Sequence, residues 1–321
     1  MGGVPRRRLP IRHRRQPTGS PTPTAPHLPK FSVYSVTVLR IGIDLGGTNI
    51  RVGFLDNGRI QGVKQAPTPA DAPQDEVLAQ IYTLLDHMPV MEAASIGAGV
   101  PSIVDADSGV VYDVQNIPSW TEVPLGKRLH ERYEVPIYVQ NDASCFALAE
   151  YHFGSGDRHS PMVGLILGTG FAGGIVVDGQ LLTGHNCGAG EFGTAPYKDS
   201  IYEHYCAGLF FERQYDTTGE AAFGRAQKGD TEAQAMFEEL GMHLGRALQS
   251  VLYAIDPAYV VLGGSVRHAY PFFEEAMWAE LKLFAFPRVL ENLTLEVSEL
   301  EHAGVLGAAA LGRQDRPSAS P

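Results

Sequence analysis

The sequence predicts an α/β protein with two lobes of similar construction around a central cleft. Strand and helix patterns alternate from residue 38 onward. An apolar strand that ends in a glycine-rich turn occurs at residues 46–47 and again at residues 168–170. Because the same device returns after a full cycle of strands and helices, we expect an internally duplicated fold.

The first lobe is expected to contain a hairpin, a further strand and a helix. Four segments have strand patterns, at residues 39–44, 51–54, 59–65 and 94–99. The dipeptide Asn57-Gly58 is typical of a two-residue hairpin turn. Apolar residues recur at three- and four-residue spacing over residues 74–88, which predicts an amphipathic helix.

The second lobe repeats this alternation and adds a long helix. Strands are expected at residues 137–140, 162–167, 174–177 and 259–262, and helices at 143–153, 231–255 and 303–311. Asp256-Pro257 ends the long helix. We therefore divide the chain into a basic extension (1–37), an N-terminal lobe (38–140), a C-terminal lobe (141–301) and a closing helix that packs back on the first lobe, with a tail (302–321).

Composition restricts the classes of protein. No apolar run approaches the roughly 18 residues of a membrane span, so a soluble protein is expected. The three cysteines form no C-x-x-C pair, which suits a reducing cytoplasm and leaves no cysteine zinc site. Residues 1–37 hold seven of the 25 basic residues and no acid, so the rest holds 18 basic and 36 acidic residues. The chain from residue 38 onward is therefore strongly acidic and is expected to repel nucleic acid.

Residues 1–37 are rich in Arg, Pro, Ser and Thr and have no apolar period. This composition predicts a disordered tail. An Arg-rich, acid-poor start is also typical of an organelle transit peptide, and a basic arm could contact nucleic acid. A wrongly assigned start codon would give the same pattern.

The first glycine turn is the segment Asp44-Leu45-Gly46-Gly47-Thr48-Asn49, directly after a strand. Glycines let a backbone approach a phosphate without a Cβ in the way. Thr48 adds a hydroxyl donor, and Asp44 can hold Mg²⁺ through water. By itself the pattern is weak, because Gly-Gly turns are common.

A second turn, Gly168-Thr169-Gly170, follows the strand at 162–167 and repeats the device. Two such loops can clamp the β- and γ-phosphates of a nucleotide, and two in order are more specific than one. A third turn, Gly263-Gly264, follows another strand and suits the nucleoside.

The motifs together resemble those of the ROK sugar kinases, which belong with hexokinase, actin and the heat-shock chaperone ATPases. The matching segments are IGIDLGGTNIRVGFLDNG, GVPSIVDADSGVVYDVQNIPSW, VQNDASCFALAE, LGTGFAGGIVVDGQLLTGHNCGAGEFG and VVLGGSV, over roughly residues 38–312. The resemblance implies the two-lobed actin-like ATPase (ribonuclease H-like) fold.

The resemblance also implies residue roles. Asp142 stands at the position of the general base, which accepts a proton from the attacking sugar hydroxyl. The positions of sugar ligands are those of Asn116, Asn141, Glu191 and Glu203, with Asp142 itself in contact with the substrate. Carboxylates and amides suit a neutral polyol, because each binds hydroxyls directionally.

Two departures from the family pattern concern the sugar pocket. Thr194 stands where the family has histidine, and Ser102 where it usually has glycine. His185 and His204 are nearby side chains that could replace the missing imidazole. These differences leave the identity of the sugar open.

The family's cysteine zinc loop is also absent. Only eleven residues separate Glu191 from Glu203, and none of them is cysteine. A tetrahedral zinc site cannot be built from them. We expect packing, through Tyr197 and Tyr202, to position Glu203 instead.

The resulting hypothesis is a cytoplasmic ATP-dependent kinase that uses Mg²⁺ and no zinc, with glucose and its 6-hydroxyl as the first choice of substrate. N-acetylmannosamine or N-acetylglucosamine kinase is the alternative. A sugar-responsive regulator of the same family is a further one, although residues 1–37 are too short and proline-rich for a helix-turn-helix domain. A homodimer is expected, with no membrane or nucleic acid partner.

Overall fold

The computed structural model of the protein describes residues 38–156 and 159–314. The expectations for residues 1–37 and for the end of the chain beyond residue 314 lie outside these ranges. The described residues belong to one compact unit. The boundary between lobes at residue 140 stays a prediction.

The first sheet contains five strands in the order β3-β2-β1-β4-β8. Its strands are β1 (Arg40–Leu45), β2 (Asn49–Asp56), β3 (Arg59–Pro67), β4 (Ser95–Val100) and β8 (Ile137–Asn141). The first three form an antiparallel meander, and β4 and β8 are parallel to β1. The strands expected in this part of the chain are confirmed.

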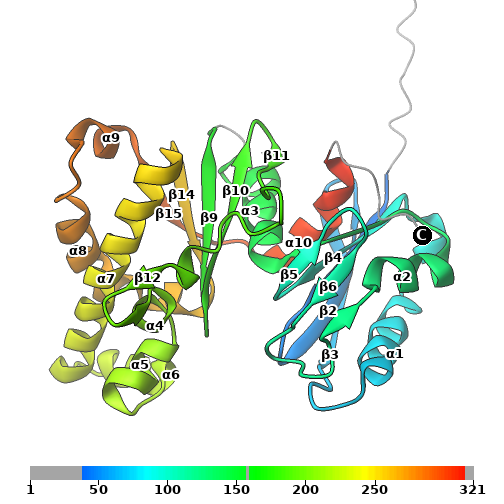
Figure 1. The fold of residues 1–321 in the computed structure, drawn as a ribbon, viewed down its shortest axis with the longest axis horizontal. Coiled ribbons are helices and arrows are strands. Elements are labelled where there is room, and N and C mark those ends of the chain that lie inside the picture. Colours follow the sequence, from blue (N-terminus) through cyan, green and yellow to red (C-terminus); the bar gives the residue numbers. More distant parts are fainter. Residues whose placement is uncertain (1–37, 157–158, 315–321) are drawn as a thin grey trace, which may run out of the picture. The chain divides into compact units, whose positions relative to one another are not determined.

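The second sheet repeats this arrangement, in the order β11-β10-β9-β14-β15. Its strands are β9 (Met162–Leu167), β10 (Phe171–Val177), β11 (Gln180–Leu181), β14 (Tyr259–Gly263) and β15 (Thr294–Val297). Again an antiparallel meander is extended by two parallel strands. The predicted internal duplication is therefore present in the sheet topology (Figure 1).

Helices cover both faces of the first sheet. Ile41 and Ile43 point to one face, where they share a buried cluster with residues of α1 (Gln74–Leu85) and α2 (Leu125–Tyr133). The other face lies against α10 (Ala303–Ala310). Large apolar residues alternate with Gly42 along β1. Because successive side chains of a strand point in opposite directions, Ile41 and Ile43 lie on one face of the sheet and Gly42 on the other.

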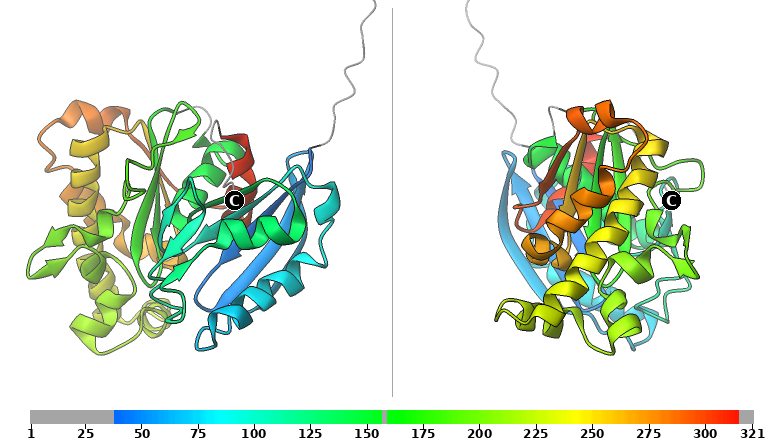
Figure 2. Two further views of the ribbon diagram at one scale, coloured as in Figure 1. Left: turned by 45° about the vertical axis from the view of Figure 1, so that its right-hand side comes forward. Right: turned by 90° about the vertical axis from the view of Figure 1, so that its left-hand side faces the viewer.

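The second sheet is covered in the same way. Leu165 and Leu262 pack with residues of α7 (Thr231–Ile255) and α8 (Tyr270–Leu281). Met162 and Val261 face α3 (Asp142–Phe153) instead. Helices α7 and α8 lie side by side in both figures (Figures 1 and 2).

Helices α3 and α10 also pack on each other, and so connect the two sheets. At their crossing, a Cβ atom on Gly307 would lie 1.7 Å from the carbonyl oxygen of Cys145. Only glycine permits this approach. The helix that opens with Asp142 is thereby fixed against both halves of the fold.

Shorter elements that the sequence did not predict complete the chain. They are β5 (Ile103–Asp105), β6 (Val110–Tyr112), β7 (Glu122–Val123), β12 (Pro196–Tyr197), β13 (Ser200–Ile201), α4 (Glu203–Cys206), α5 (Leu209–Tyr215), α6 (Gly219–Ala226) and α9 (Pro287–Asn292). Strands β5, β6 and β7 form a small sheet of their own.

Two boundaries differ from the prediction by three residues, whereas the other differences are of one or two residues. The first helix ends at Leu85 rather than residue 88: the N–H groups of His87 and Met88 bond to carbonyls three residues earlier, and Pro89 disfavours helical geometry in Met88. Strand β10 begins at Phe171, since its pairing with β9 extends to the glycine turn. None of the helices within 38–156 and 159–314 has the length and hydrophobicity that a bilayer span requires.

Candidate active site

The first glycine turn joins β1 to β2 and is held by backbone hydrogen bonds. The Gly46 N–H donates to the Asn49 carbonyl at 3.0 Å, and the Thr68 hydroxyl donates to the Gly46 carbonyl at 2.6 Å. Thr48, at the tip, is exposed. The turn is therefore rigid, with an accessible hydroxyl and backbone.

Asp44 lies near the end of β1, beside this turn. In the β1–β2 register it is opposite Arg51, whose Nη1 donates to Oδ2 at 3.3 Å. Its carboxyl also faces the start of α10, because a Cβ on Gly304 would lie 2.6 Å from its Cγ. Burial raises the pKa of Asp44, and the positive charge of Arg51 opposes that shift.

The second glycine turn joins β9 to β10 and closes in the same manner. The Gly168 N–H donates to the Gly170 carbonyl at 3.0 Å. The Gly168 carbonyl in turn accepts from the Gly208 N–H at 2.8 Å, which attaches the turn to the start of α5. Thr169 is exposed at the tip, as Thr48 is in the first turn.

The third glycine turn follows β14. Gly264 has a φ of +80°, a conformation that favours glycine. A Cβ there would lie 2.2 Å from the Leu167 carbonyl oxygen, so the turn contacts the end of β9. The second and third glycine turns are thus neighbours.

Asn141 ends β8 and caps α3. Its Oδ1 accepts from the N–H groups of Ala143 at 2.9 Å and Ser144 at 3.3 Å. Its Nδ2 donates to the Ser102 carbonyl at 3.2 Å. An Asn side chain has two N–H donors, so one remains for a ligand. Asn141 can therefore cap the helix, as asparagine commonly does, and still contact a substrate.

Asp142 is the first residue of α3, and its Oδ1 accepts from the Ala143 N–H at 2.8 Å. Burial, then the nearby charge of Asp44, raises the pKa of the Asp142 carboxyl to about 7. The charge of Glu191 acts in the same direction, and the Ala143 N–H opposes it. Asp142 can therefore exchange a proton near neutral pH.

Glu191 and Glu203 continue this group of acids toward the second glycine turn. Burial, with the charge of Glu203, raises the pKa of Glu191. Glu203 Oε2 accepts from the Phe171 N–H at 2.9 Å, directly after that turn. A Cβ on Gly170 would lie 2.6 Å from the same oxygen, so glycine permits this contact.

Asn116 lies on the connection between β6 and β7. A Cβ on Gly47 would lie 2.7 Å from the Asn116 Cβ, so this segment contacts the first glycine turn. Asn116 is exposed, while Trp120, four residues later, is 1% exposed and anchors the connection. The predicted site residues of the first half of the chain are thus brought together.

The segment between the two glutamates is held by aromatic packing. The rings of Tyr197 and Tyr202, through which we expected packing to position Glu203, are stacked, with centroids 4.3 Å apart. The Thr194 hydroxyl donates to the Glu191 carbonyl at 2.9 Å, and His204 Nδ1 is 2.6 Å from the Ser200 hydroxyl. Among the described residues, no three acidic, His or Cys side chains are grouped as a metal site.

Sequence reasoning did not identify Arg51 as the partner of Asp44. The hairpin register contained the signal: a three-residue turn between β1 and β2 places residue 51 opposite residue 44. His243, which contacts Tyr197, was also missed. That contact joins residues 46 positions apart, and no local pattern indicates it.

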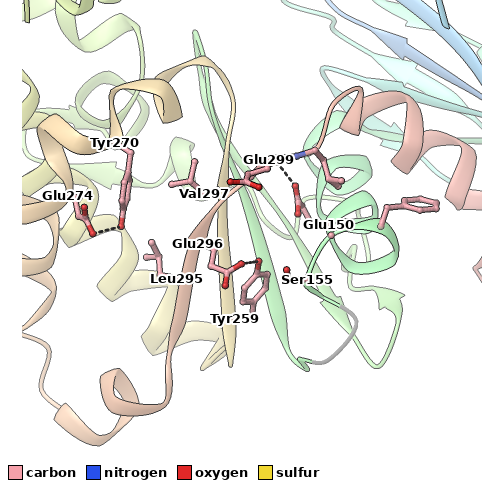
Figure 3. A pocket seen from close by; sticks show the side chains of 13 residues that line it. Glu150, Ser155, Tyr259, Tyr270, Glu274, Leu295, Glu296, Val297 and Glu299 are labelled. Atoms are coloured by element: carbon pink, nitrogen blue, oxygen red, sulfur yellow. Dashed lines mark hydrogen bonds between the residues drawn. The ribbon is translucent and has the colours of Figure 1, made fainter. Parts of the chain in front are cut away.

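A cavity of about 810 Å³ lies elsewhere, at the other end of α3 (Figure 3). Its lining contains four glutamates, among them Glu150, and the hydroxyls of Tyr259 and Tyr270 donate to two others. None of the predicted site residues lines it. Glu150 is eight positions along α3 from Asp142, which corresponds to about 12 Å. This cavity is separate from the candidate active site.

Comparisons with known proteins agree with this architecture. Residues 40–315 match the sequence model of the ROK family. A glucokinase from Halalkalibacterium halodurans is 28% identical over 317 residues, covering 87% of this chain and 96% of that protein. An N-acetyl-D-glucosamine kinase from Escherichia coli is 30% identical over 261 residues, covering 71% and 84%.

The fold is also similar to that in a crystal structure of a ROK family glucokinase from Streptomyces griseus in complex with glucose and AMPPNP. The two chains are 26% identical with a TM-score of 0.72, and the match covers 86% of this chain and 99% of that one. The fold is thus the duplicated, two-lobed α/β fold of the actin-like ATPases, and the class of protein is a sugar kinase. The chain belongs to the ROK family.

Proposed function

We propose that the protein transfers the γ-phosphoryl group of ATP to a hydroxyl of an aldohexose, with the 6-hydroxyl of glucose as the preferred acceptor. The observation that supports this most is that the charges of Asp44 and Glu191 both raise the pKa of the Asp142 carboxyl, so the three acids lie near one another. This group of acids extends from the first glycine turn to the second. A sugar bound beside Asp142 would have phosphate-binding loops within reach.

In this proposal Asp142 is the general base. A sugar hydroxyl is a weak nucleophile until its proton leaves, and a positioned carboxylate contributes about 10²- to 10⁴-fold to the rate. The pKa of about 7 suits the task, because such a carboxylate is basic yet largely ionised just above neutrality. Asn116, Asn141, Glu191 and Glu203 would orient the sugar hydroxyls.

The glycine turns would hold ATP. Gly46, Gly47, Thr48 and Asn49 would face the phosphates from one side, and Gly168, Thr169 and Gly170 from the other. Gly263 and Gly264 would contact the nucleoside. The exposed hydroxyls of Thr48 and Thr169 at the turn tips support this role.

The residues also fit Mg²⁺. This ion is commonly held by one or two carboxylates together with phosphate oxygens and water, so a full protein cage is unnecessary. Asp44, whose Oδ2 receives a single long hydrogen bond from Arg51, retains oxygens for a bound water. When bound, Mg²⁺ neutralises charge on the phosphates. We assign no zinc to the segment between Glu191 and Glu203.

A second group of substrates is N-acetylglucosamine and N-acetylmannosamine. The 30% identical N-acetyl-D-glucosamine kinase favours the former. Thr194, which is exposed and shorter than the histidine of the family pattern, is consistent with a change in the pocket. We further propose a cytoplasmic homodimer.

A panel of sugars tests the proposed function. ADP release should be measured by a coupled assay with glucose, mannose, N-acetylglucosamine and N-acetylmannosamine, each with Mg²⁺ and ATP. We expect the largest kcat/KM for glucose. A higher value for an N-acetylhexosamine would reassign the substrate. Sugar binding by calorimetry without ADP release from any sugar would instead support a sugar-responsive regulator.

The reaction should depend on pH through Asp142. The carboxylate is the basic form, so kcat/KM for sugar should fall as the pH decreases through about 7. The measurement is kcat/KM for sugar from pH 5 to 9, because this ratio reports the pKa of the enzyme without bound sugar. Glu191→Gln should move this midpoint to lower pH, because the charge of Glu191 raises the pKa of Asp142. If the midpoint does not move in this variant, the charge of Glu191 does not act on the pKa of Asp142.

A further inference from the structure

Glu203 is carried by a short hairpin that leads into a helix. Strands β12 and β13 pair through Pro196 and Ile201, and the Tyr202 N–H donates to the Ala195 carbonyl at 3.1 Å. The Tyr202 carbonyl accepts from the Cys206 N–H at 2.9 Å in the following turn. The backbone around Glu203 is therefore fixed locally, but the hairpin still needs an attachment to the rest of the fold.

Helix α7 supplies that attachment at two points. The Tyr197 hydroxyl is 3.0 Å from His243 Nδ1, and the Tyr202 hydroxyl is 3.0 Å from the Ser250 hydroxyl. Residues 243 and 250 are seven positions apart, so they lie on the same face of the helix, about two turns from each other. Tyr197 and Tyr202, which both precede Glu203, thus bind one face of a long, well-packed helix.

Ring packing reinforces the first contact. Tyr197 is stacked on Tyr202 and meets the Tyr205 ring edge-on at 5.3 Å. The Tyr205 ring in turn packs against His243 at 5.0 Å and beneath the Lys198 ammonium at 4.7 Å. His243 is 5% exposed and therefore lies at the centre of this aromatic cluster.

The imidazole is held in its neutral form. Burial, and then the positive charge of Lys198, lowers the pKa of His243, while Glu239 opposes the shift. Nε2 faces both Lys198 at 3.3 Å and Glu239 at 3.4 Å. A neutral ring can share a hydrogen bond with the Tyr197 hydroxyl without placing a net charge in the cluster.

The result of this attachment is visible at Glu203. Its carboxylate is aimed at the start of β10, where it accepts the Phe171 N–H next to Gly170. The carboxylate can keep this position only if the hairpin does not shift relative to β10.

We propose that His243, through Tyr197 and the Tyr197–Tyr202 stack, positions Glu203 at the second glycine turn and so sets the affinity for the sugar. His243 is then a positioning residue. This inference rests on the proposed function, in which Glu203 is a sugar ligand.

Variants that remove the polar atoms of the Tyr197–His243 contact test the inference. Tyr197→Phe deletes only the hydroxyl and keeps the stacked ring, and Tyr197 is half-buried, so the variant should fold. We expect the KM for sugar to rise about 3- to 10-fold, as for loss of one hydrogen bond, while kcat and the KM for ATP stay within about twofold. His243→Phe should give the same pattern, and the double variant should be no worse than the poorer single variant.

A rescue variant and a neighbour provide the controls. His243→Asn retains a polar atom near the Nδ1 position and should recover part of the sugar affinity. Met242→Ala changes an adjacent α7 residue that is 45% exposed, and it should leave both KM values unchanged. Equal changes in both KM values for Tyr197→Phe would overturn the inference.

Amide hydrogen exchange at Phe171 gives a readout independent of activity, because its N–H is bonded to Glu203. In Tyr197→Phe we expect faster exchange at this amide than in the wild type, but slower than in Glu203→Ala, in which the acceptor is removed. Exchange at the wild-type rate would overturn the positioning role. Faster exchange with an unchanged KM for sugar would instead overturn the assignment of Glu203 as a sugar ligand, and with it that part of the proposed function.

Discussion

Asp142→Asn is expected to lower kcat by at least about 10²-fold and to leave the KM for sugar within a few-fold of wild type. The amide has the size of the carboxylate and can still accept the Ala143 N–H, so α3 keeps its first turn. It cannot accept the proton of the attacking hydroxyl. Steady-state kinetics with sugar and ATP varied in turn measures both effects.

Asp107→Asn is a matched control, since Asp107 is an exposed acid in the turn between β5 and β6. It should retain full activity. Turnover of Asp142→Asn within a few-fold of wild type would exclude Asp142 as the base. We do not expect Asp142→Asn to lower the melting temperature. Burial and the charge of Asp44 raise the pKa of Asp142, so replacing its carboxylate by a neutral amide removes a repulsion.

Most of the fold could be predicted because its strands are strongly apolar and its turns are marked by glycine. The segments around Asp44 and Thr169 each consist of an apolar strand, a glycine turn and a second strand, and both became antiparallel hairpins. The 25-residue helix α7 was found from its periodicity, with the same bounds. These signals are local, so they can be recognised without knowledge of tertiary contacts.

The elements that were missed have weak local signals. Strands β5, β6 and β7 have two or three residues each, too few for an alternating pattern to be distinguished from a loop. Helix α8 has apolar and aromatic residues over much of its circumference, so no single face shows a three- and four-residue period. Its packing against α7 decides its structure.

The candidate site shows the same division. Motif order alone assigned Asp142 and Glu191 to one site, and in the structure the charge of Glu191 raises the pKa of Asp142. The motifs could not indicate that Arg51 binds Asp44, nor that His243 contacts Tyr197. Such supporting residues come from neighbouring strands or from a helix far along the chain, where the family motifs have no counterpart.

The grouping of acids has an energetic consequence for ligand binding. The charges of Asp44 and Glu191 raise the pKa of Asp142, and the charge of Glu203 raises the pKa of Glu191, so these acids repel one another when the site is empty. Hydroxyl donors of a sugar can stabilise Glu191 and Glu203, and a metal-bound nucleotide can offset the charge of Asp44. Binding of sugar and of nucleotide should therefore each relieve part of the repulsion.

Glu191→Ala and Glu203→Ala should each raise the KM for sugar about 10-fold or more, with a much smaller effect on the KM for ATP. Removing one acceptor leaves sugar hydroxyls unpaired in a dry pocket, which costs about 1–3 kcal/mol. The measurement is steady-state kinetics with each substrate varied at saturation of the other. Glu238→Ala, which removes an exposed glutamate from α7, is the control and should change neither constant.

The two glutamates should differ in a way that follows from their contacts. Glu203 also accepts the Phe171 N–H beside the second glycine turn, so Glu203→Ala frees a backbone donor next to the loop that we assign to phosphate. Its effect on the KM for ATP should therefore exceed that of Glu191→Ala. Glu203→Gln keeps an oxygen for this N–H and should restore the ATP constant, while the sugar constant stays raised because an amide accepts fewer hydroxyl donors than a carboxylate. If the alanine variants weakened both substrates equally, the glutamates would be structural residues and the sugar would bind elsewhere.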